Sequence, residues 1–226
     1  NGENHRNSLI DKSNQHRFIL VVPEFSENYF SGGDGYNLGN IFIDGDNPSL
    51  ETLNPNDEWT FSVLDPLFIY FKNLVTNYSN NYNLIGFSAG GQLAHRSFIF
   101  NNSIYCQQTI SMSSGWYTTI DENQNFPYGL NESPFNSNNI ASLFSRNLTI
   151  LIGQNDNDPN APNLRRNSIV DLQGNNRFDR AEYFYTSAEN LANEKNYIFN
   201  WQKFVVPNAA HDLSPIANFA VDLLYQ

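Results

Sequence analysis

Ser88 is flanked by closely spaced glycines in the segment Gly86-Phe87-Ser88-Ala89-Gly90-Gly91. An apolar run precedes this segment, and an apolar helical pattern follows it. A serine that attacks a carbonyl carbon must project from a tight strand-to-helix turn, where small residues two positions on either side let the backbone pass. That turn also directs the backbone N–H of Ala89 toward the oxyanion that forms. The spacing predicts a nucleophilic Ser88; the alternative is a structural serine in a glycine-rich turn.

A nucleophilic serine needs a base and an orienting acid, which follow it in the order Ser, Asp, His when the serine lies in such a turn. Of the four histidines, only His211 follows a late strand-like run and precedes the last helical pattern. His211 is therefore the predicted base, and an ordinary surface-loop histidine is the alternative. His95 lies seven residues after Ser88 on the following helix, where packing or solvation is expected.

Two aspartates, Asp156 and Asp158, follow the apolar run 148–152 and could orient the histidine. Asp156 is the preferred acid, and Asp158 is the alternative. The pair also has the spacing of the first ligands in an EF-hand calcium loop. That loop then requires glycine at position 6 and glutamate at position 12, where the chain has Ala161 and Asn167. We therefore expect no metal site here.

The composition indicates one globular domain over residues 1–226, with 40% hydrophobic residues in a mass of 25.8 kDa. The formal net charge of −11 and the pI near 4.6 argue against nucleic acid as a partner, because phosphate backbones would be repelled. No apolar run approaches the 18 residues of a membrane span. The single cysteine, Cys106, excludes an internal disulfide and any cysteine-based zinc site.

Apolar runs of strand length alternate with helical patterns along the chain. Strands are expected at 18–22, 82–87, 104–112, 148–152 and 201–206, and helices at 57–76, 89–100, 181–194 and 214–224, with Pro66 kinking the first of these helices or marking its start. Such alternation predicts a three-layer α/β fold, with a mostly parallel central sheet and helices on both faces. Two long aromatic-rich loops, 23–58 and 115–146, interrupt the pattern and are expected over the ligand-binding edge of the sheet.

These motifs together resemble the α/β-hydrolase superfamily. Further segments resemble a bacterial group within it, akin to poly(3-hydroxybutyrate) depolymerase and feruloyl-esterase-like hydrolases: 22–26 (VPEFS), 36–40 (YNLGN), 114–117 (SGWY), 126–130 (FPYGL) and 158–160 (DPN). The resemblance covers essentially the whole chain. It implies a serine hydrolase without a cofactor, in which Ser88 is the nucleophile, His211 the base and Asp156 the acid.

The resemblance also implies further site residues. In this family a His-Gly motif usually follows the strand at which the second oxyanion donor lies. This chain starts Asn1-Gly2-Glu3, with Asn1 where the histidine of the motif would be. Because the donor is a backbone N–H, Asn1 need not abolish activity, and the loop at Gly2 and Glu3 is the candidate donor. Phe87 and the pair Trp116-Tyr117 are candidate walls of the substrate pocket; the alternative for that pair is ordinary aromatic core.

The expected activity is cleavage of a small or polymeric carboxylic ester through an acyl-enzyme. A peptidase or amidase with the same residues is an alternative, and a non-catalytic ligand-binding protein on this fold is another. If 18–22 is a strand, the strand that leads into Gly2 must precede Asn1. In the superfamily sheet, that strand lies between the strands at 18–22 and 82–87. We therefore expect most of one hydrolase domain that lacks at least one N-terminal strand. Secretion or a periplasmic location is slightly favoured over the cytoplasm; the sequence predicts no oligomeric state.

Overall fold

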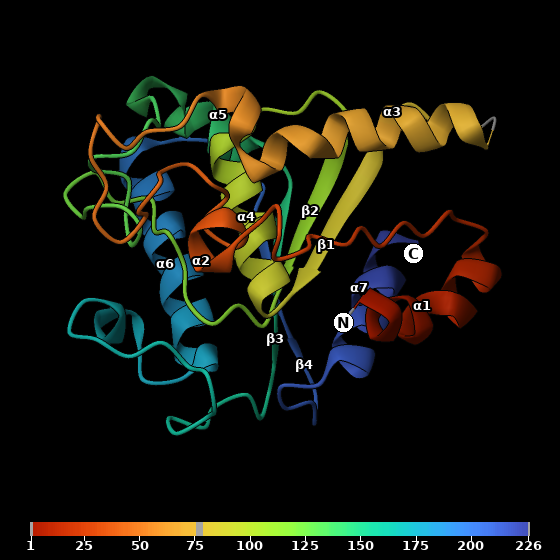
Figure 1. Cartoon of the computed structure of the whole chain (residues 1–226). Coiled ribbons are helices and arrows are strands. Elements are labelled where there is room, and N and C mark those ends of the chain that lie inside the picture. Colours follow the sequence, from red (N-terminus) through yellow and green to blue (C-terminus); the bar gives the residue numbers. More distant parts are fainter. Residues whose placement is uncertain (1, 76–78, 226) are drawn as a thin grey trace.

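In the computed structural model, which describes residues 2–75 and 79–225, a twisted parallel sheet lies between two layers of helices (Figure 1). The described residues form four strands in the spatial order β1-β2-β3-β4: Tyr82–Phe87, Cys106–Met112, Leu148–Gly153 and Gln202–Val206. Each neighbouring pair is parallel. The predicted fold class is confirmed, and the predicted bounds of β1 are those observed. Predictions that concern Asn1 and Thr76 lie outside the described residues.

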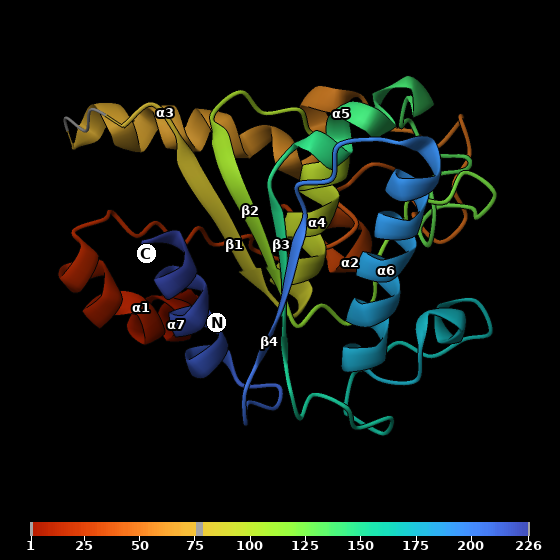
Figure 2. The same ribbon diagram turned by 180° about the vertical axis from the view of Figure 1, so that it is seen from behind.

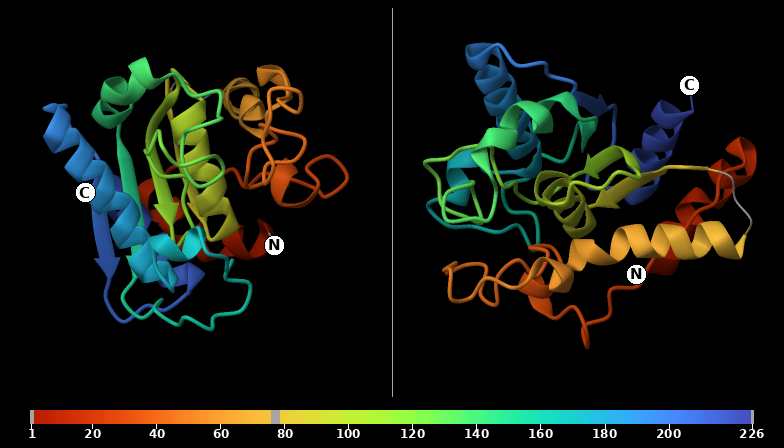
Figure 3. Two further views of the ribbon diagram at one scale, coloured as in Figure 1. Left: turned by 90° about the vertical axis from the view of Figure 1, so that its left-hand side faces the viewer. Right: turned by 90° about the horizontal axis from the view of Figure 1, so that it is seen from above.

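Helices cover both faces of this sheet. The helix α4 (Ala89–Phe100) contacts β1 and β2, and α6 (Arg177–Lys195) contacts β3 on the same face. The opposite face is covered by α7 (Leu213–Leu224), against which α1 (Gly2–His16) packs. The view from above separates the three layers (Figure 3). This is the arrangement expected when parallel strands are joined by right-handed crossovers.

The helix predicted at 57–76 is shorter and follows two 3₁₀ turns, η1 (Asn56–Glu58) and η2 (Thr60–Val63). The α-helix α3 occupies Leu64–Leu74, and Pro66 lies in its first turn, where a missing N–H is tolerated. The remaining described helices lie in loops: α2 (Gly32–Gly35), η3 (Ser137–Asn139), α5 (Ile140–Ser145) and η4 (Val170–Gln173).

The strand predicted at 18–22 is wrong for this structure, because that segment is extended but belongs to no strand. An apolar run becomes a strand only where a neighbouring strand supplies ladder hydrogen bonds, and no described strand pairs with this one. Its side chains are nevertheless used in packing. Phe18 and Leu20 pack against the core beneath α7, and the Phe18 ring stacks on Tyr225 with centroids 5.2 Å apart.

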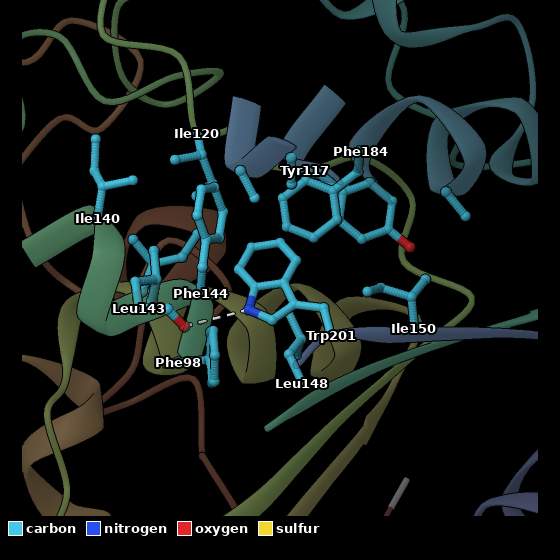
Figure 4. Close-up of a cluster of buried hydrophobic side chains, with 14 of the residues drawn as sticks. Phe98, Tyr117, Ile120, Ile140, Leu143, Phe144, Leu148, Ile150, Phe184 and Trp201 are labelled. Carbon is cyan, nitrogen blue, oxygen red and sulfur yellow. Dashed lines mark hydrogen bonds between the residues drawn. The ribbon is translucent and has the colours of Figure 1, made fainter. Parts of the chain in front are cut away.

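The largest buried core lies between the sheet and the layer of α4 and α6 (Figure 4). Trp201 stands at its centre, with its ring 5.4 Å from that of Phe184 and 5.3 Å from that of Phe144. The indole N–H donates a hydrogen bond to the carbonyl of Leu143 at 3.3 Å, so the one polar atom of this side chain is satisfied. A second core lies under α7 on the other face of the sheet, and a third lies among the long loops.

We expect Trp201→Ala to lower the free energy of unfolding by about 3–5 kcal/mol, because it removes a large buried side chain and leaves a cavity. Urea titration followed by circular dichroism measures the change. Tyr29→Ala is the control, since Tyr29 is 85% exposed and should change stability by less than about 0.5 kcal/mol. Equal effects of the two substitutions would contradict this account of the core.

Candidate active site

Ser88 occupies a strained turn between β1 and α4, with φ 56° and ψ −115°. A Cβ atom at Gly86 would lie 2.0 Å from the Gly90 carbonyl oxygen, so only glycine fits where the strand passes the helix. The Ser88 N–H donates to the Met112 carbonyl oxygen at 2.9 Å, which ties the turn to the end of β2. A non-glycine residue keeps such a backbone conformation only where its surroundings fix it.

His211 and Asp156 reach Ser88 from the loops that follow β4 and β3. Both loops leave the sheet at the carboxyl ends of its strands (Figure 2). His211 Nε2 lies 3.1 Å from Ser88 Oγ, and His211 Nδ1 lies 2.8 Å from Asp156 Oδ2. Because Nδ1 faces a carboxylate, the proton of the neutral imidazole belongs on Nδ1, and Nε2 is then free to accept the serine proton.

Backbone contacts between the two loops fix this geometry. The N–H of Asn155 donates to the Ala209 carbonyl at 2.8 Å, and that of Gln154 donates to the Val206 carbonyl at 3.0 Å. A Cβ at Gly153 would lie 2.3 Å from the Ala210 carbonyl oxygen. The glycine that ends β3 therefore allows the two loops to approach closely.

The two candidate acids differ in environment. Asp156 is buried at 4% exposure and points at the imidazole. Asp158 is exposed, and its carboxylate accepts the N–H of Asn160 at 2.8 Å instead. The geometry supports the preferred acid and not the alternative.

The first turn of α1 corrects the expectation of a loop at Gly2 and Glu3, since both residues lie in this helix. In that turn the His5 ring lies 6.5 Å from the ring of Phe87, the residue before Ser88. Backbone N–H groups in the first turn of a helix have no partner within the helix, so they remain candidate donors. The same holds for Ala89, which is exposed at the start of α4.

Trp116 and Tyr117 belong to the core, and this corrects their proposed role as pocket walls. Tyr117 is fully buried and stacks on Phe184 with ring centroids 4.5 Å apart. Trp116 is buried with the Arg96 guanidinium 4.1 Å above its ring. Phe87, in contrast, is half-buried, and its ring centroid lies 4.7 Å from that of His211, beside the candidate site.

Two further residues lie near the site and were not predicted as site residues. The Tyr36 hydroxyl lies 3.4 Å from where a Cβ on Gly90 would be, beside the start of α4. The Arg177 guanidinium lies beside the Asp156 carboxylate, with Nη1 3.6 Å from Oδ1. Tyr36 lies in a segment that carried the family resemblance, but no spacing rule connects either side chain with Ser88.

His95 is fully buried, as packing would require. Its Nδ1 lies 3.1 Å from the Gly91 carbonyl oxygen, and its Nε2 accepts the Thr118 N–H at 3.1 Å. Burial, together with the adjacent Arg96 charge, lowers the pKa of His95 well below its ordinary value of 6.5. The ring is therefore neutral in the folded protein, whereas it takes up a proton in the unfolded chain below that pH.

Because of this difference in proton binding, we expect the free energy of unfolding to decrease as the pH is lowered. Below pH 6.5 the unfolded state binds the His95 proton and the folded state does not, which costs at most about 1.4 kcal/mol per pH unit. We expect His95→Gln to remove that part of the slope. Urea unfolding at pH 7.5 and pH 5.0 measures the difference between the parent and the variant. Parallel stability curves would contradict a neutral buried His95.

Within residues 2–75 and 79–225, no group of three or more His, Cys, Asp or Glu side chains is arranged to hold a metal ion. No helix in the same ranges is both long and apolar enough to cross a bilayer.

A parallel α/β sheet with a serine in the turn after one strand, and an aspartate and a histidine after later strands, defines the α/β-hydrolase fold. The chain has this fold and resembles a hydrolase and a depolymerase that share it.

Several solved structures are similar to this chain over its whole length or nearly so. Poly(aspartic acid) hydrolase-1 from Sphingomonas sp. KT-1 is 29% identical with a TM-score of 0.94, over 100% of this chain and 84% of that one. A poly(3-hydroxybutyrate) depolymerase from Bordetella parapertussis is 27% identical with a TM-score of 0.90, over 100% and 74%. A siderophore hydrolase from Aspergillus nidulans, 14% identical over 98% of this chain and 77% of its own with a TM-score of 0.52, shares the fold. No family model and no curated protein sequence matches the chain.

These neighbours confirm the resemblance to hydrolases of the poly(3-hydroxybutyrate) depolymerase type. They support hydrolase activity for this chain.

Proposed function

We propose that the protein is a serine hydrolase that cleaves carboxylic esters through an acyl-enzyme, with Ser88, His211 and Asp156 as its catalytic residues. The observation that carries this proposal is the continuous hydrogen-bonded path from Ser88 Oγ through both imidazole nitrogens to the buried Asp156 carboxylate. A structural serine in a glycine-rich turn needs no such path. The strained Ser88 backbone gives further support, because strain of this kind gathers at functional sites.

In this mechanism Ser88 Oγ attacks the ester carbonyl carbon while His211 Nε2 takes the serine proton. The imidazolium then gives that proton to the leaving alkoxide as the C–O bond breaks, which releases the alcohol and leaves the acyl group on Ser88. Water repeats the sequence, with His211 as base, and releases the acid. Asp156 keeps the proton on Nδ1 and stabilises the imidazolium.

The negative charge of the tetrahedral intermediate needs hydrogen-bond donors that are already in place. In this proposal the Ala89 N–H, at the positive end of α4, is one donor. A backbone N–H in the first turn of α1, at Gly2 or Glu3, is the second. The His5 ring, in the first turn of α1, lies 6.5 Å from the Phe87 ring, and α4 begins directly after Ser88, which supports the assignment.

The neighbours favour a polymeric substrate but differ in the bond that it contains. The name of one gives a polyester, poly(3-hydroxybutyrate), and the name of the other gives poly(aspartic acid), whose residues are joined by amide bonds. We therefore propose ester hydrolysis first and amide hydrolysis by the same residues as the second candidate.

Matched chromogenic substrates test this proposal and separate the two candidates. The wild-type protein should release p-nitrophenol from p-nitrophenyl butyrate with a kcat/KM at least about 100-fold above that for p-nitroaniline from the matched butyryl anilide. The reverse preference would replace the esterase with an amidase. Absence of turnover on both, and on oligomers of 3-hydroxybutyrate and of aspartate, would favour a non-catalytic binding protein.

A further inference from the structure

Asp156 has a charged neighbour, Arg177, in addition to the His211 imidazole. Arg177 is the first residue of α6, and its Nη1 lies 3.6 Å from Asp156 Oδ1, on the carboxylate oxygen that His211 does not use. Both side chains are almost inaccessible, at 6% and 4% exposure. Among the described residues, Arg177 is the only permanently charged side chain that forms an ion pair with Asp156, and His211 is its hydrogen-bond partner.

Burial makes this contact important. A carboxylate removed from water is disfavoured in its charged form unless a cation or several hydrogen bonds compensate it. The Asp156 carboxylate accepts a hydrogen bond from His211 only, within the described residues. The Arg177 guanidinium therefore supplies the compensating charge, and it supplies it without competing for Oδ2.

The position of Arg177 is fixed by its surroundings. Its Nη2 donates to the Pro162 carbonyl at 3.4 Å, and the adjacent Phe178 N–H donates to the Asp156 carbonyl at 3.0 Å. Asn176 caps α6 by accepting the Asp179 N–H at 2.9 Å. The start of α6 is thereby attached to the loop that carries the acid. The buried Arg177 Nε has no hydrogen-bond partner among the described residues.

We propose that Arg177 is a positioning residue for the hydrolytic reaction: its buried guanidinium compensates the charge of the Asp156 carboxylate and directs Oδ2 to His211 Nδ1. This inference rests on the proposed catalytic roles of Ser88, His211 and Asp156. Within the described residues Arg177 forms an ion pair with Asp156 and a hydrogen bond with the Pro162 carbonyl, so its proposed effect on the reaction passes through the aspartate.

Further polar and charged groups lie around this pair. Tyr117 interacts electrostatically with Asp156, and Arg180 interacts electrostatically with Arg177. Asp212, next to His211, is engaged with the Ala210 N–H.

Loss of the Arg177 charge leaves the buried Asp156 carboxylate with no compensating cation among the described residues. The carboxylate then holds the imidazole less well in the orientation that accepts the Ser88 proton, and kcat falls.

The test compares Arg177→Gln and Arg177→Met with Arg177→Lys, which keeps a positive charge. The substrate is p-nitrophenyl butyrate. We expect the two uncharged variants to lose about tenfold in kcat with KM changed less than about twofold. Arg177→Lys keeps the charge and should keep kcat within about threefold of the parent.

Arg166→Gln is the matched control. Arg166 lies in the same connection between β3 and α6, but it is paired with Asp171 and is 45% exposed. It should leave both kcat and KM unchanged.

An undiminished kcat in a folded, uncharged Arg177 variant would overturn the proposal. So would failure of both uncharged variants to fold beside an active Arg177→Lys, because the role would then be structural. An unchanged kcat in these variants beside an inactive Ser88→Ala would refute the role of Arg177 and leave the proposed function standing. Undiminished activity in Ser88→Ala would refute the proposed function itself.

Discussion

Ser88→Ala is expected to lower kcat for p-nitrophenyl butyrate by at least about 10⁴-fold, while the protein stays folded. Removal of Oγ removes the atom that bonds to the acyl group, and no other group in this mechanism takes its place. The assay compares initial rates at saturating substrate with those of the parent protein. Far-UV circular dichroism and the thermal midpoint check that the fold is retained.

Ser49→Ala is the control for this substitution, because Ser49 is an exposed loop serine remote in sequence from the site. It should show parent activity. A Ser88→Ala protein that hydrolyses the ester within tenfold of the parent would contradict the assignment of the nucleophile.

Asp156→Asn is expected to lower kcat by about 10³–10⁴-fold with little change in KM. The amide is nearly the same size as the carboxylate, so packing is kept, but its NH₂ group can donate to Nδ1. Donation there favours the tautomer with the proton on Nε2, which can no longer accept the proton of Ser88. The measurement is the Michaelis profile of the ester reaction at the pH optimum.

Asp158→Asn provides a matched control two residues away. Its carboxylate is exposed and engaged with Asn160, so kcat should change by less than about twofold. A larger loss in Asp158→Asn than in Asp156→Asn would mean that the loop rearranges in the working enzyme and that the acid is Asp158.

The sequence predicts best where local pattern and long-range packing favour the same structure. The observed bounds of β1 and α4 are those predicted, because an apolar run, a glycine-rich turn and a helical pattern follow one another without a gap. The order Ser88, Asp156, His211 was predictable for the same reason: each residue follows a recognisable strand. Parallel strands bring their carboxyl ends to one edge of the sheet, and the predicted chemistry followed from that.

The features that were not predicted depend on contacts with residues distant in sequence, which a local sequence pattern does not show. Residues 18–22 are as apolar as β3, yet a strand requires a neighbour, and the described sheet offers none at that position. Trp116 and Tyr117 follow a strand end, as pocket residues do, but their rings turn into two cores. Arg177 and Asp156 are 21 positions apart and are brought together by an irregular loop. No periodicity of the sequence predicts such an ion pair.

The central claim is that Ser88 is a nucleophile activated by His211 and Asp156. Reaction of the wild-type protein with a fluorophosphonate probe, followed by proteolysis and mass mapping, tests it most directly. The account predicts a single stoichiometric adduct on the peptide that contains Ser88, formed at least about 100-fold more slowly in His211→Ala. Labelling at a different residue, or no labelling of folded protein, would contradict it.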